Sequence, residues 1–311
     1  MGVFSSKPAL HENNLPDQKG KVFLITGSSG GLGKLLAGYL YARNGSVYIA
    51  ARSASKAQAA IREIQSQHPG STGKLVYLPL DLGDLATLSQ TASRFLAAES
   101  RLDVLFNNAG VMIPPQGSTT AQGYELQLGT NALGPFLLTR LLYPVLRRTA
   151  QASPRGEVRV VWVSSSAVGI APTPAIDFEN MHYQRDESAW TKYARSKAGN
   201  VLHAAEYARR SKAAGDGVVH VTLDPGVLMT DLQRTTPWWQ FIFIYLIAKH
   251  PKFGAYTELF AGLQPDIKLE PESTWVGQPG ILTPCPRPDL FDEALGRRYW
   301  EWTESQIEKY M

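Results

Sequence analysis

Two side chains four residues apart could transfer a proton. Tyr193 and Lys197 stand at positions i and i+4 of the segment YARSK, and on a helix this spacing puts both side chains on one face. A lysine ammonium beside a phenol favours the phenolate, which lowers the tyrosine pKa from its usual value of about 10. A tyrosine tuned in this way can donate a proton near neutral pH, so the pair predicts a general acid/base.

A glycine-rich segment earlier in the chain could hold a dinucleotide. It lies between an apolar run at 21–26 and a helical apolar pattern at 31–44. Glycines at such a strand-to-helix turn let the backbone approach a pyrophosphate, and the helix N-terminus offers free N–H groups. Together with the tyrosine and the lysine, this turn predicts a redox enzyme. The residues of the turn that we expect to contact the cofactor are Gly27, Ser29, Gly31, Leu32 and Gly33.

The end of the second predicted strand favours NADP(H). An acidic residue there would bind the ribose 2′-hydroxyl of NAD and repel the 2′-phosphate of NADP. The strand instead ends in Ile49-Ala-Ala-Arg52, without an acid. The Arg52 guanidinium can form two hydrogen bonds to a phosphate and can stack on adenine. We therefore expect Arg52 to bind the 2′-phosphate. The alternative is a solvated arginine at a helix entrance.

Two further strand ends carry polar residues that could face the cofactor. Asp81 and Leu82 close the third predicted strand, where the carboxylate could meet the adenine amino group or could cap a helix. The fourth strand closes with two asparagines, an alanine and a glycine, which could serve as a strand-end turn or contact the cofactor. From this segment we expect Asn107, Ala109 and Gly110 at the cofactor.

The elements that must position these residues alternate between strand and helix. We expect strands at 21–26, 46–50, 74–80, 103–106, 158–163 and 218–223, and helices at 31–44, 55–67, 85–98, 124–148 and 188–212. A short helix at 255–263, a strand at 274–276 and a helix at 289–310 should follow. Such βαβ repetition predicts an α/β Rossmann fold, a doubly wound parallel sheet with helices on both faces.

Composition is consistent with one soluble globular domain. Of 311 residues, 44% are apolar and 19% are charged, and the net charge is +4 without long runs of like charge. We therefore expect no nucleic-acid partner, and we expect no bound metal. One cysteine and no bilayer-spanning apolar segment suit a cytoplasmic protein. We divide the chain into an extension at 1–20 and a single domain at 21–311; nothing in the sequence specifies an oligomeric state.

The extension allows two interpretations. Residues 1–6 match the short pattern for N-myristoylation, with Gly2 as acceptor and Ser6 at the required position, which would give weak peripheral membrane contact. The alternative is a plain disordered leader that ends near Gly20.

Taken together, these motifs resemble the short-chain dehydrogenase/reductases, and the likeness runs from about residue 21 to residue 263. The matching motifs, in order, are Thr26-Gly27-x-x-x-Gly31-x-Gly33, Asp81-Leu82, Asn107-Asn108-Ala109-Gly110, Asn131, Ser164-Ser165-Ser166, Tyr193-x-x-x-Lys197 and Asp224-Pro225-Gly226 with Thr230. Within the family, the long spacer at 167–192 and the segment YARSKAGN are similar to the retinol-dehydrogenase-like branch and its fungal relatives. We see no hydrophobic N-terminal anchor of the kind that membrane retinol dehydrogenases carry.

The resemblance implies the catalytic roles. Tyr193 would give its phenolic proton to a substrate carbonyl oxygen as hydride arrives from the nicotinamide, while Lys197 would hold the nicotinamide ribose. A serine hydroxyl would donate to the developing oxyanion. Counting from the preceding strand selects Ser165 and counting back from Gly169 selects Ser166; we favour Ser165 because strand register aims the side chain.

Asn131 falls four residues before Pro135, which has no N–H. The usual i+4 partner of the Asn131 carbonyl is therefore missing, which predicts a kink and a carbonyl free to bind water. In the family, this asparagine supports a water that links the lysine to solvent for reprotonation of the tyrosine. An ordinary proline kink is the alternative.

The segment after the sixth predicted strand should close the site. By resemblance, Pro225, Gly226, Val227 and Thr230 would line the nicotinamide, and residues 227–263 would form a helical lid. The most apolar stretch, 238–247, could roof the pocket, pack in the core or touch a membrane surface. A roof of this kind suggests a hydrophobic small-molecule substrate.

We therefore predict NADP(H)-dependent interconversion of a carbonyl and an alcohol. Reduction of an activated C=C bond at the same site is a second enzymatic hypothesis. A regulatory protein that binds NADPH without turnover is a third.

Overall fold

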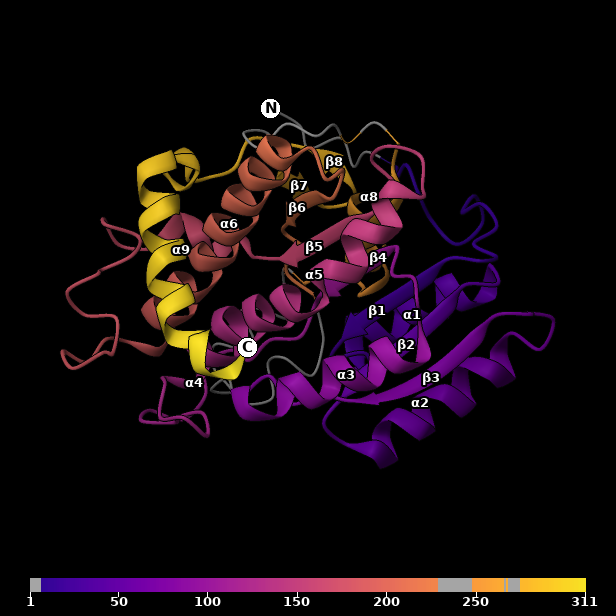
Figure 1. Cartoon of the computed structure of the whole chain (residues 1–311), viewed down its shortest axis with the longest axis horizontal. Helices are drawn as coiled ribbons and strands as arrows, with labels where there is room; N and C mark the ends of the chain where they lie inside the picture. Colours follow the sequence, from indigo (N-terminus) through magenta and orange to yellow (C-terminus); the bar gives the residue numbers. More distant parts are fainter. Residues whose placement is uncertain (1–6, 229–247, 266, 268–274) are drawn as a thin grey trace.

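The computed structural model describes residues 7–228, 248–265, 267 and 275–311. These residues form one eight-stranded sheet, which is parallel except for its last strand (Figure 1). In spatial order the strands are β3 (Lys74–Pro79), β2 (Ser46–Ala51), β1 (Val22–Thr26), β4 (Val104–Asn107), β5 (Arg159–Val163), β6 (Val219–Leu223), β7 (Trp275–Gly277) and β8 (Ile281–Leu282). The predicted doubly wound parallel sheet is confirmed, and the antiparallel β8 is an addition to it.

Helices cover both faces of the sheet. One face carries α1 (Gly31–Ala42), α2 (Ala54–Gln67) and α8 (Lys252–Leu263), whose apolar residues share a core with the strands. The other face carries α3 (Leu88–Ala98), α5 (Gly134–Gln151) and α6 (Ala189–Ala214), and α9 (Glu293–Ile307) packs beside α6 (Figure 1). Short turns complete the described elements: η1 (Leu85–Thr87), α4 (Leu126–Leu128), η2 (Gly129–Leu133), η3 (Ser166–Ile170), η5 (Pro288–Phe291) and η6 (Glu308–Tyr310).

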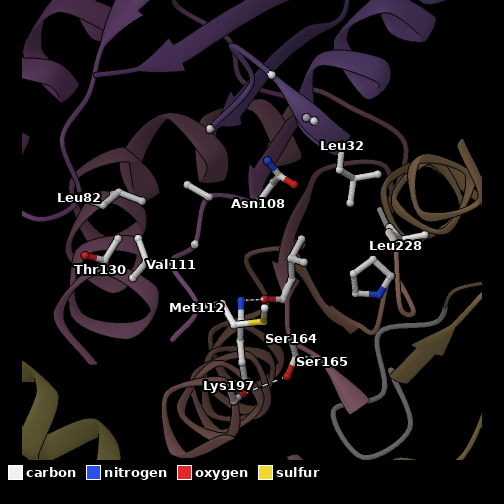
Figure 2. A pocket seen from close by; sticks show the side chains of 18 of the residues that line it. Leu32, Leu82, Asn108, Val111, Met112, Thr130, Ser164, Ser165, Lys197 and Leu228 are labelled. Atoms are coloured by element: carbon white, nitrogen blue, oxygen red, sulfur yellow. Dashed lines mark hydrogen bonds between the residues drawn. The ribbon is translucent and has the colours of Figure 1, made fainter. Parts of the chain in front are cut away.

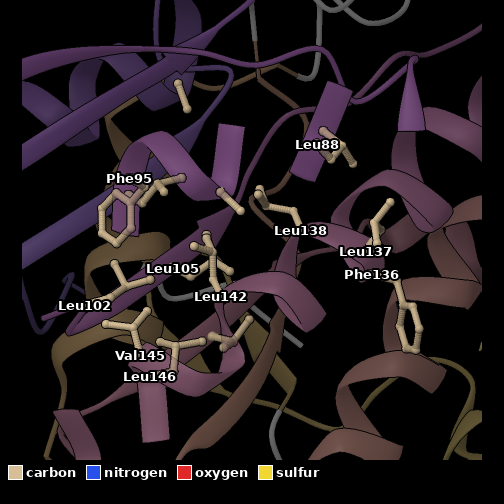
Figure 3. Packing of buried hydrophobic residues seen from close by; sticks show 14 of the residues in the cluster. Leu88, Phe95, Leu102, Leu105, Phe136, Leu137, Leu138, Leu142, Val145 and Leu146 are labelled. Atoms are coloured by element: carbon tan, nitrogen blue, oxygen red, sulfur yellow. The ribbon is translucent and has the colours of Figure 1, made fainter. Parts of the chain in front are cut away.

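The core on the α3, α5 and α6 face is a dense layer of leucines and aromatic rings (Figure 3). Leu88 and Phe95 of α3 belong to this layer together with Leu105 of β4 and Leu142 of α5, and all four are fully buried. Burial of one such side chain stabilises a fold by roughly 1.5–3 kcal/mol. This layer fixes the strands whose carboxyl ends carry the predicted site.

The expected helix at 124–148 is the clearest departure from the predicted elements. The structure has a short α-helical turn, a π-helical turn at Gly129–Leu133 and then α5, which continues to Gln151. Pro135 explains the break, because it cannot supply the N–H that would close a regular helix around Asn131. The last helix also starts later than expected, at Glu293, where the Asp292 carboxylate accepts the N–H of Leu295 at 2.7 Å.

The expected disordered leader is wrong for the part that the structure describes. Residues 7–20 pack against α1 and α8: the Leu15 side chain is buried, and Arg43 donates to the carbonyl of Glu12 at 2.8 Å. Asn44 donates to the Asp17 carboxylate at 2.8 Å. Gly2 and Ser6, with the proposed myristoylation pattern, lie outside the described residues. In the described part of the chain, no helix combines the length and apolar character needed to cross a membrane.

Candidate active site

The carboxyl ends of the parallel strands surround a cavity of about 660 Å³. This is the edge at which open α/β sheets bind ligands, and the volume is in the range of small-molecule sites. Figure 2 shows Leu32 and Leu228 on one side of the pocket and Leu82, Val111 and Thr130 on the other. The predicted site residues that line it are Gly27, Ser29, Gly31, Leu32, Gly33, Arg52, Asp81, Leu82, Ala109, Gly110, Ser165, Tyr193, Lys197, Pro225, Gly226 and Val227.

The glycine turn is packed tightly against the end of β4. Gly27 has φ +72°, and a Cβ there would lie 3.0 Å from Ala109. A Cβ on Gly33 would lie 2.6 Å from the Asn108 amide nitrogen, which donates to the carbonyl of Thr26 at 2.7 Å. The turn therefore needs glycine both for its conformation and for its closeness to the neighbouring strand.

Asn108, rather than Asn107, is the asparagine at the pocket. Asn107 is the last residue of β4, and its buried amide donates to the Thr139 hydroxyl at 3.0 Å on the α5 side of the sheet. It is not among the lining residues, whereas Asn108 is. Successive side chains of a strand point to opposite faces, so a choice between adjacent residues decides which one faces the pocket.

Basic and hydroxyl groups gather where β2 meets α2. Arg52 lines the pocket with Ser53 and Lys56, two residues that belong to none of the sequence motifs above. Ser53 is the N-cap of α2, and its hydroxyl accepts the N–H of Lys56 at 3.3 Å. Lys56 lies in the first turn of α2, close to Arg52 in the sequence. This closeness is a local signal from which a second phosphate-binding residue could have been predicted.

Asp81 faces the pocket but does not cap the helical turn that follows, because the N-cap of η1 is Asp84. It lines the pocket, and its carboxylate accepts the N–H of Gly83 at 2.9 Å. The same carboxylate therefore holds the turn after β3 while it faces the cavity.

The structure brings Tyr193, Lys197 and Ser165 together. The side chains of Tyr193 and Lys197 are buried, and the ammonium lies 5.9 Å from the centre of the phenol ring. Lys197 also donates to the carbonyl of Val163 at 2.9 Å, which fixes α6 against the end of β5. The Ser165 side chain hydrogen-bonds to the phenol.

Ser166 has a different partner, the Asp224 carboxyl, which accepts from both its N–H and its hydroxyl. Ser164 is turned away, since its hydroxyl donates to the carbonyl of Lys197 at 2.9 Å. The three serines thus have three separate partners, and the geometry favours Ser165 as the residue that faces a substrate beside Tyr193.

The expected lowering of the tyrosine pKa does not occur in this structure. Burial raises the pKa of Tyr193 to about 12, even though the Ser165 hydrogen bond opposes the rise, and the nearby Asp224 charge adds to it. Burial also lowers the pKa of Lys197 to about 8, against the opposing effects of Asp224 and Glu258. Desolvation therefore outweighs the proximity of the lysine, and the phenol is protonated throughout the neutral range.

Two acidic residues, Asp224 and Glu258, raise the pKa of Lys197, a role that the sequence did not predict for them. Asp224, at the end of β6, accepts the N–H of Gly226 at 3.0 Å, and burial raises its pKa. Glu258, on α8, is fully buried, and its carboxyl oxygens have no hydrogen-bond partner among the described residues. Burial raises the pKa of Glu258 to about 8. Asp224 belongs to a motif that the sequence showed, whereas no local sequence pattern signals Glu258, because α8 meets the site only through the fold.

Asn131 lies behind the pocket wall, in the π-helical turn. Its side chain accepts the N–H of Val111 at 2.8 Å, donates to the Val111 carbonyl at 2.9 Å and donates to the Ser196 hydroxyl at 3.0 Å. A Cβ on Gly110 would lie 3.2 Å from the Asn131 amide oxygen and 3.4 Å from the Lys197 nitrogen. The asparagine is thus next to the lysine, and the water relay stays a prediction.

Apolar side chains surround the end of the pocket that holds Tyr193. Met112, Ile170, Trp190 and Val227 line it, and Ile170 and Val227 are 66% and 38% exposed. Trp190 meets the Tyr193 ring edge-on with a centroid distance of 6.2 Å. Thr230 and the apolar stretch 238–247, which we expected at this end, lie outside the described residues.

Comparison with known proteins agrees with this geometry. A sequence model of the family described as short chain dehydrogenase matches residues 21–176. The short-chain dehydrogenase/reductase pkfC of Emericella nidulans is 53% identical over 312 residues, covering 99% of this chain and 100% of that protein.

Solved structures give the same result for the fold. An uncharacterised protein of Mycobacterium paratuberculosis is similar with a TM-score of 0.73 and 29% identity, over 96% of this chain and 97% of that one. The NADPH-bound carbonyl reductase from chicken fatty liver is similar in fold, with a TM-score of 0.63 and 21% identity, over 86% of this chain and 99% of that one.

The packing of the glycine turn yields a test of the pocket. Gly33→Ala should weaken the binding of a nicotinamide dinucleotide by about tenfold, or roughly 1.4 kcal/mol, because the new Cβ displaces the Asn108 amide. Fluorescence titration with NADPH and NADH measures this. Gly38→Ala on the same helix is the matched control, since its Cβ would meet only Ile64 at an ordinary 3.9 Å. Unchanged affinity in Gly33→Ala would mean that the nucleotide binds elsewhere.

Proposed function

This chain belongs to the short-chain dehydrogenase/reductase family, a family of oxidoreductases, and on that premise we propose that it interconverts a carbonyl and an alcohol on a hydrophobic small molecule with NADP(H). One observation carries the proposal: a single pocket is lined by the glycine turn and Arg52 as well as by Tyr193, Ser165 and Lys197. A nucleotide site and a proton donor thus share one cavity.

The residues present fit a nicotinamide dinucleotide. The glycine turn and the N-terminus of α1 would hold the pyrophosphate, and Asp81 would face the adenine. Arg52 and Lys56 would hold a 2′-phosphate, and no acidic residue ends β2 to repel it. When bound, the cofactor supplies or accepts the hydride.

The proton step belongs to Tyr193. In the reductive direction its phenol gives a proton to the substrate oxygen, while Ser165 donates a hydrogen bond to the same oxygen as negative charge develops. A pKa of about 12 keeps the phenol protonated at neutral pH. This is the protonation state that the reductive direction requires. Lys197 would hold the ribose and, with Asn131 beside it, connect the tyrosine to solvent.

The substrate class follows from the walls near Tyr193. Met112, Ile170, Trp190 and Val227 offer apolar and aromatic surface, part of it exposed. A substrate that covers this surface gains roughly 25 cal/mol for each Å² removed from water. Long-chain or ring-bearing carbonyl compounds fit these walls better than small polar sugars.

A panel of aldehydes, ketones, quinones and activated alkenes with NADPH tests the proposal directly. We expect oxidation of NADPH with carbonyl compounds, and with deuterated NADPH the label should lie on a carbinol carbon. A label on a saturated carbon would identify C=C reduction instead. If nothing turns over while a protein partner binds only in the presence of NADPH, the chain has a regulatory role.

Tyr193→Phe should remove most turnover and leave NADPH affinity nearly unchanged. The phenyl ring keeps the packing against Trp190 but has no proton to give, and losses of a general acid are about 10²–10⁴-fold. Steady-state kcat and a binding titration separate the two effects. A variant with wild-type kcat would refute the assignment of the proton donor.

Arg52→Ala should weaken NADPH binding by about tenfold or more and NADH binding much less. Only NADPH carries the 2′-phosphate to which the guanidinium can donate hydrogen bonds. Dissociation constants for both cofactors measure the difference. Arg62→Ala, which removes an exposed arginine of the helix α2 that follows Arg52, is the control. Equal losses for the two cofactors would rule out the phosphate role.

Asp224→Asn should move the alkaline fall of kcat/KM to lower pH. Reduction needs Tyr193 protonated and Lys197 charged, and the negative charge of Asp224 raises the pKa of both groups. Without that charge, both lose their protons at lower pH, and Lys197, with a pKa of about 8, does so first. Glu258 also faces Lys197 and raises its pKa, so part of the effect should remain.

The pH profile of the reductive reaction measures this shift. Asp177→Asn, which removes a carboxylate from a surface ion pair with Arg185, should leave the profile in place. An alkaline limb that stays at the wild-type pH in Asp224→Asn would show that this charge does not act on the proton donor.

A further inference from the structure

The residue after Met112 has an unfavourable backbone conformation. Ile113 has φ +48°, in the left-handed region that β-branched residues rarely adopt. Strain of this kind persists only where the surroundings impose it, and it is common at ligand sites. The N–H of Ile113 donates to the side-chain oxygen of Gln127 at 3.0 Å, so Gln127 is the contact that holds this conformation.

The same Gln127 amide reaches the start of α6. Its nitrogen donates to the carbonyl of Ala189 at 3.0 Å and to the carboxylate of Glu125 at 3.3 Å. Ala189 precedes Trp190, the aromatic wall of the pocket beside Tyr193. The Gln127 side chain is fully buried and is not part of the pocket lining.

We propose that Gln127 is a positioning residue that sets the width of the substrate-binding end of the pocket by tying the Met112 wall to the Trp190 wall. The inference rests on the proposed carbonyl reduction at Tyr193 and adds the residue that determines which substrates fit. In this proposal a ring-bearing substrate contacts both walls, whereas a small aliphatic carbonyl compound needs neither of them. Gln127 therefore governs selectivity for ring-bearing substrates.

The chemistry of an amide explains why this position carries glutamine. One acceptor serves the strained Ile113 N–H, and two donors serve Ala189 and Glu125. Glutamate at 127 would keep the acceptor but would face the Ala189 carbonyl and the Glu125 carboxylate without a proton to offer. Methionine would fill the space and remove both links. We call the hydrogen bonds of the Gln127 amide to Ile113 and Ala189 the brace. The two substitutions thus separate its link to the Met112 wall from its link to the Trp190 wall.

Gln122 provides a matched control. Its amide accepts the N–H of Leu85 at 3.0 Å and donates to Asp84 at 2.7 Å, so both hydrogen bonds go to one neighbouring turn, and Gln122 does not line the pocket. Gln122→Met removes comparable hydrogen bonds without affecting either wall. A general loss of stability would therefore appear in both variants, while a loss of pocket width appears only at position 127.

The kinetic test compares diacetyl with benzil, which present the same dicarbonyl group with methyl or phenyl substituents. With NADPH, Gln127→Met should lower kcat/KM for benzil by about tenfold, within the range that a misplacement of about 1 Å can cause. It should change kcat/KM for diacetyl and the Kd of NADPH by less than about twofold. Gln127→Glu should lie between Gln127→Met and the wild type, and Gln122→Met should match the wild type.

Equal losses for the two dicarbonyl compounds, or the same selectivity change in Gln122→Met, would overturn the inference. Hydrogen exchange of the Ile113 amide tests the brace without turnover: Gln127→Met should accelerate it, while Gln127→Glu and Gln122→Met should not. If the wild-type protein reduces neither compound, the proposed reaction fails on these probes and the exchange experiment alone decides. Unchanged exchange in Gln127→Met would then reject the brace.

Discussion

A buried ammonium group constrains the end of the pocket that holds Tyr193. Lys197 is removed from water and donates to the last carbonyl of β5, so its charge must be balanced by groups that the fold supplies. Asp224 comes from the end of β6 and Glu258 from α8 on the opposite face of the sheet. Elements on both faces therefore converge on one charge. Because Asp224 also anchors Ser166, the arrangement that balances the lysine leaves Ser165 beside the phenol.

The two ends of the pocket are built in different ways. The end at the glycine turn, where we propose nucleotide binding, consists of turns that directly follow strands, so its side chains and N–H groups are positioned by the sheet itself. The end at Tyr193, where we propose substrate binding, consists of longer segments, at 111–125 and 166–190, that are held by side-chain contacts. Arg195 is an example: it pairs with Glu187 at 2.7 Å and donates to the carbonyls of Pro174 and Ala175. Changes in these contacts can alter the walls while the strand ends stay in place.

This difference explains how much the sequence alone could predict. Strand and helix periodicity located the parallel sheet, and the strand-end motifs located most of the pocket lining, because both signals are local. Asn107 was misplaced because adjacent strand residues face opposite ways and the motif contains two asparagines. The direction of the Tyr193 pKa was wrong because the spacing of tyrosine and lysine reveals proximity but not burial. Glu258 and Gln127 could not be recognised, since their partners are distant in sequence.

The π-helical turn at Gly129–Leu133 has a consequence for how such a site can arise. A π turn is an α-helix with one residue inserted, and each residue advances a helix by about 100°. The insertion rotates everything before it, including Gln127, relative to α5, whose apolar face is fixed in the core. Deleting a single residue here would rotate Gln127 by about 100° relative to α5, away from the segments that it holds, while Pro135 would still leave one carbonyl without a helical partner. Inserting one residue into a helix has the opposite effect: it re-aims one end of the helix while the packed end remains unchanged.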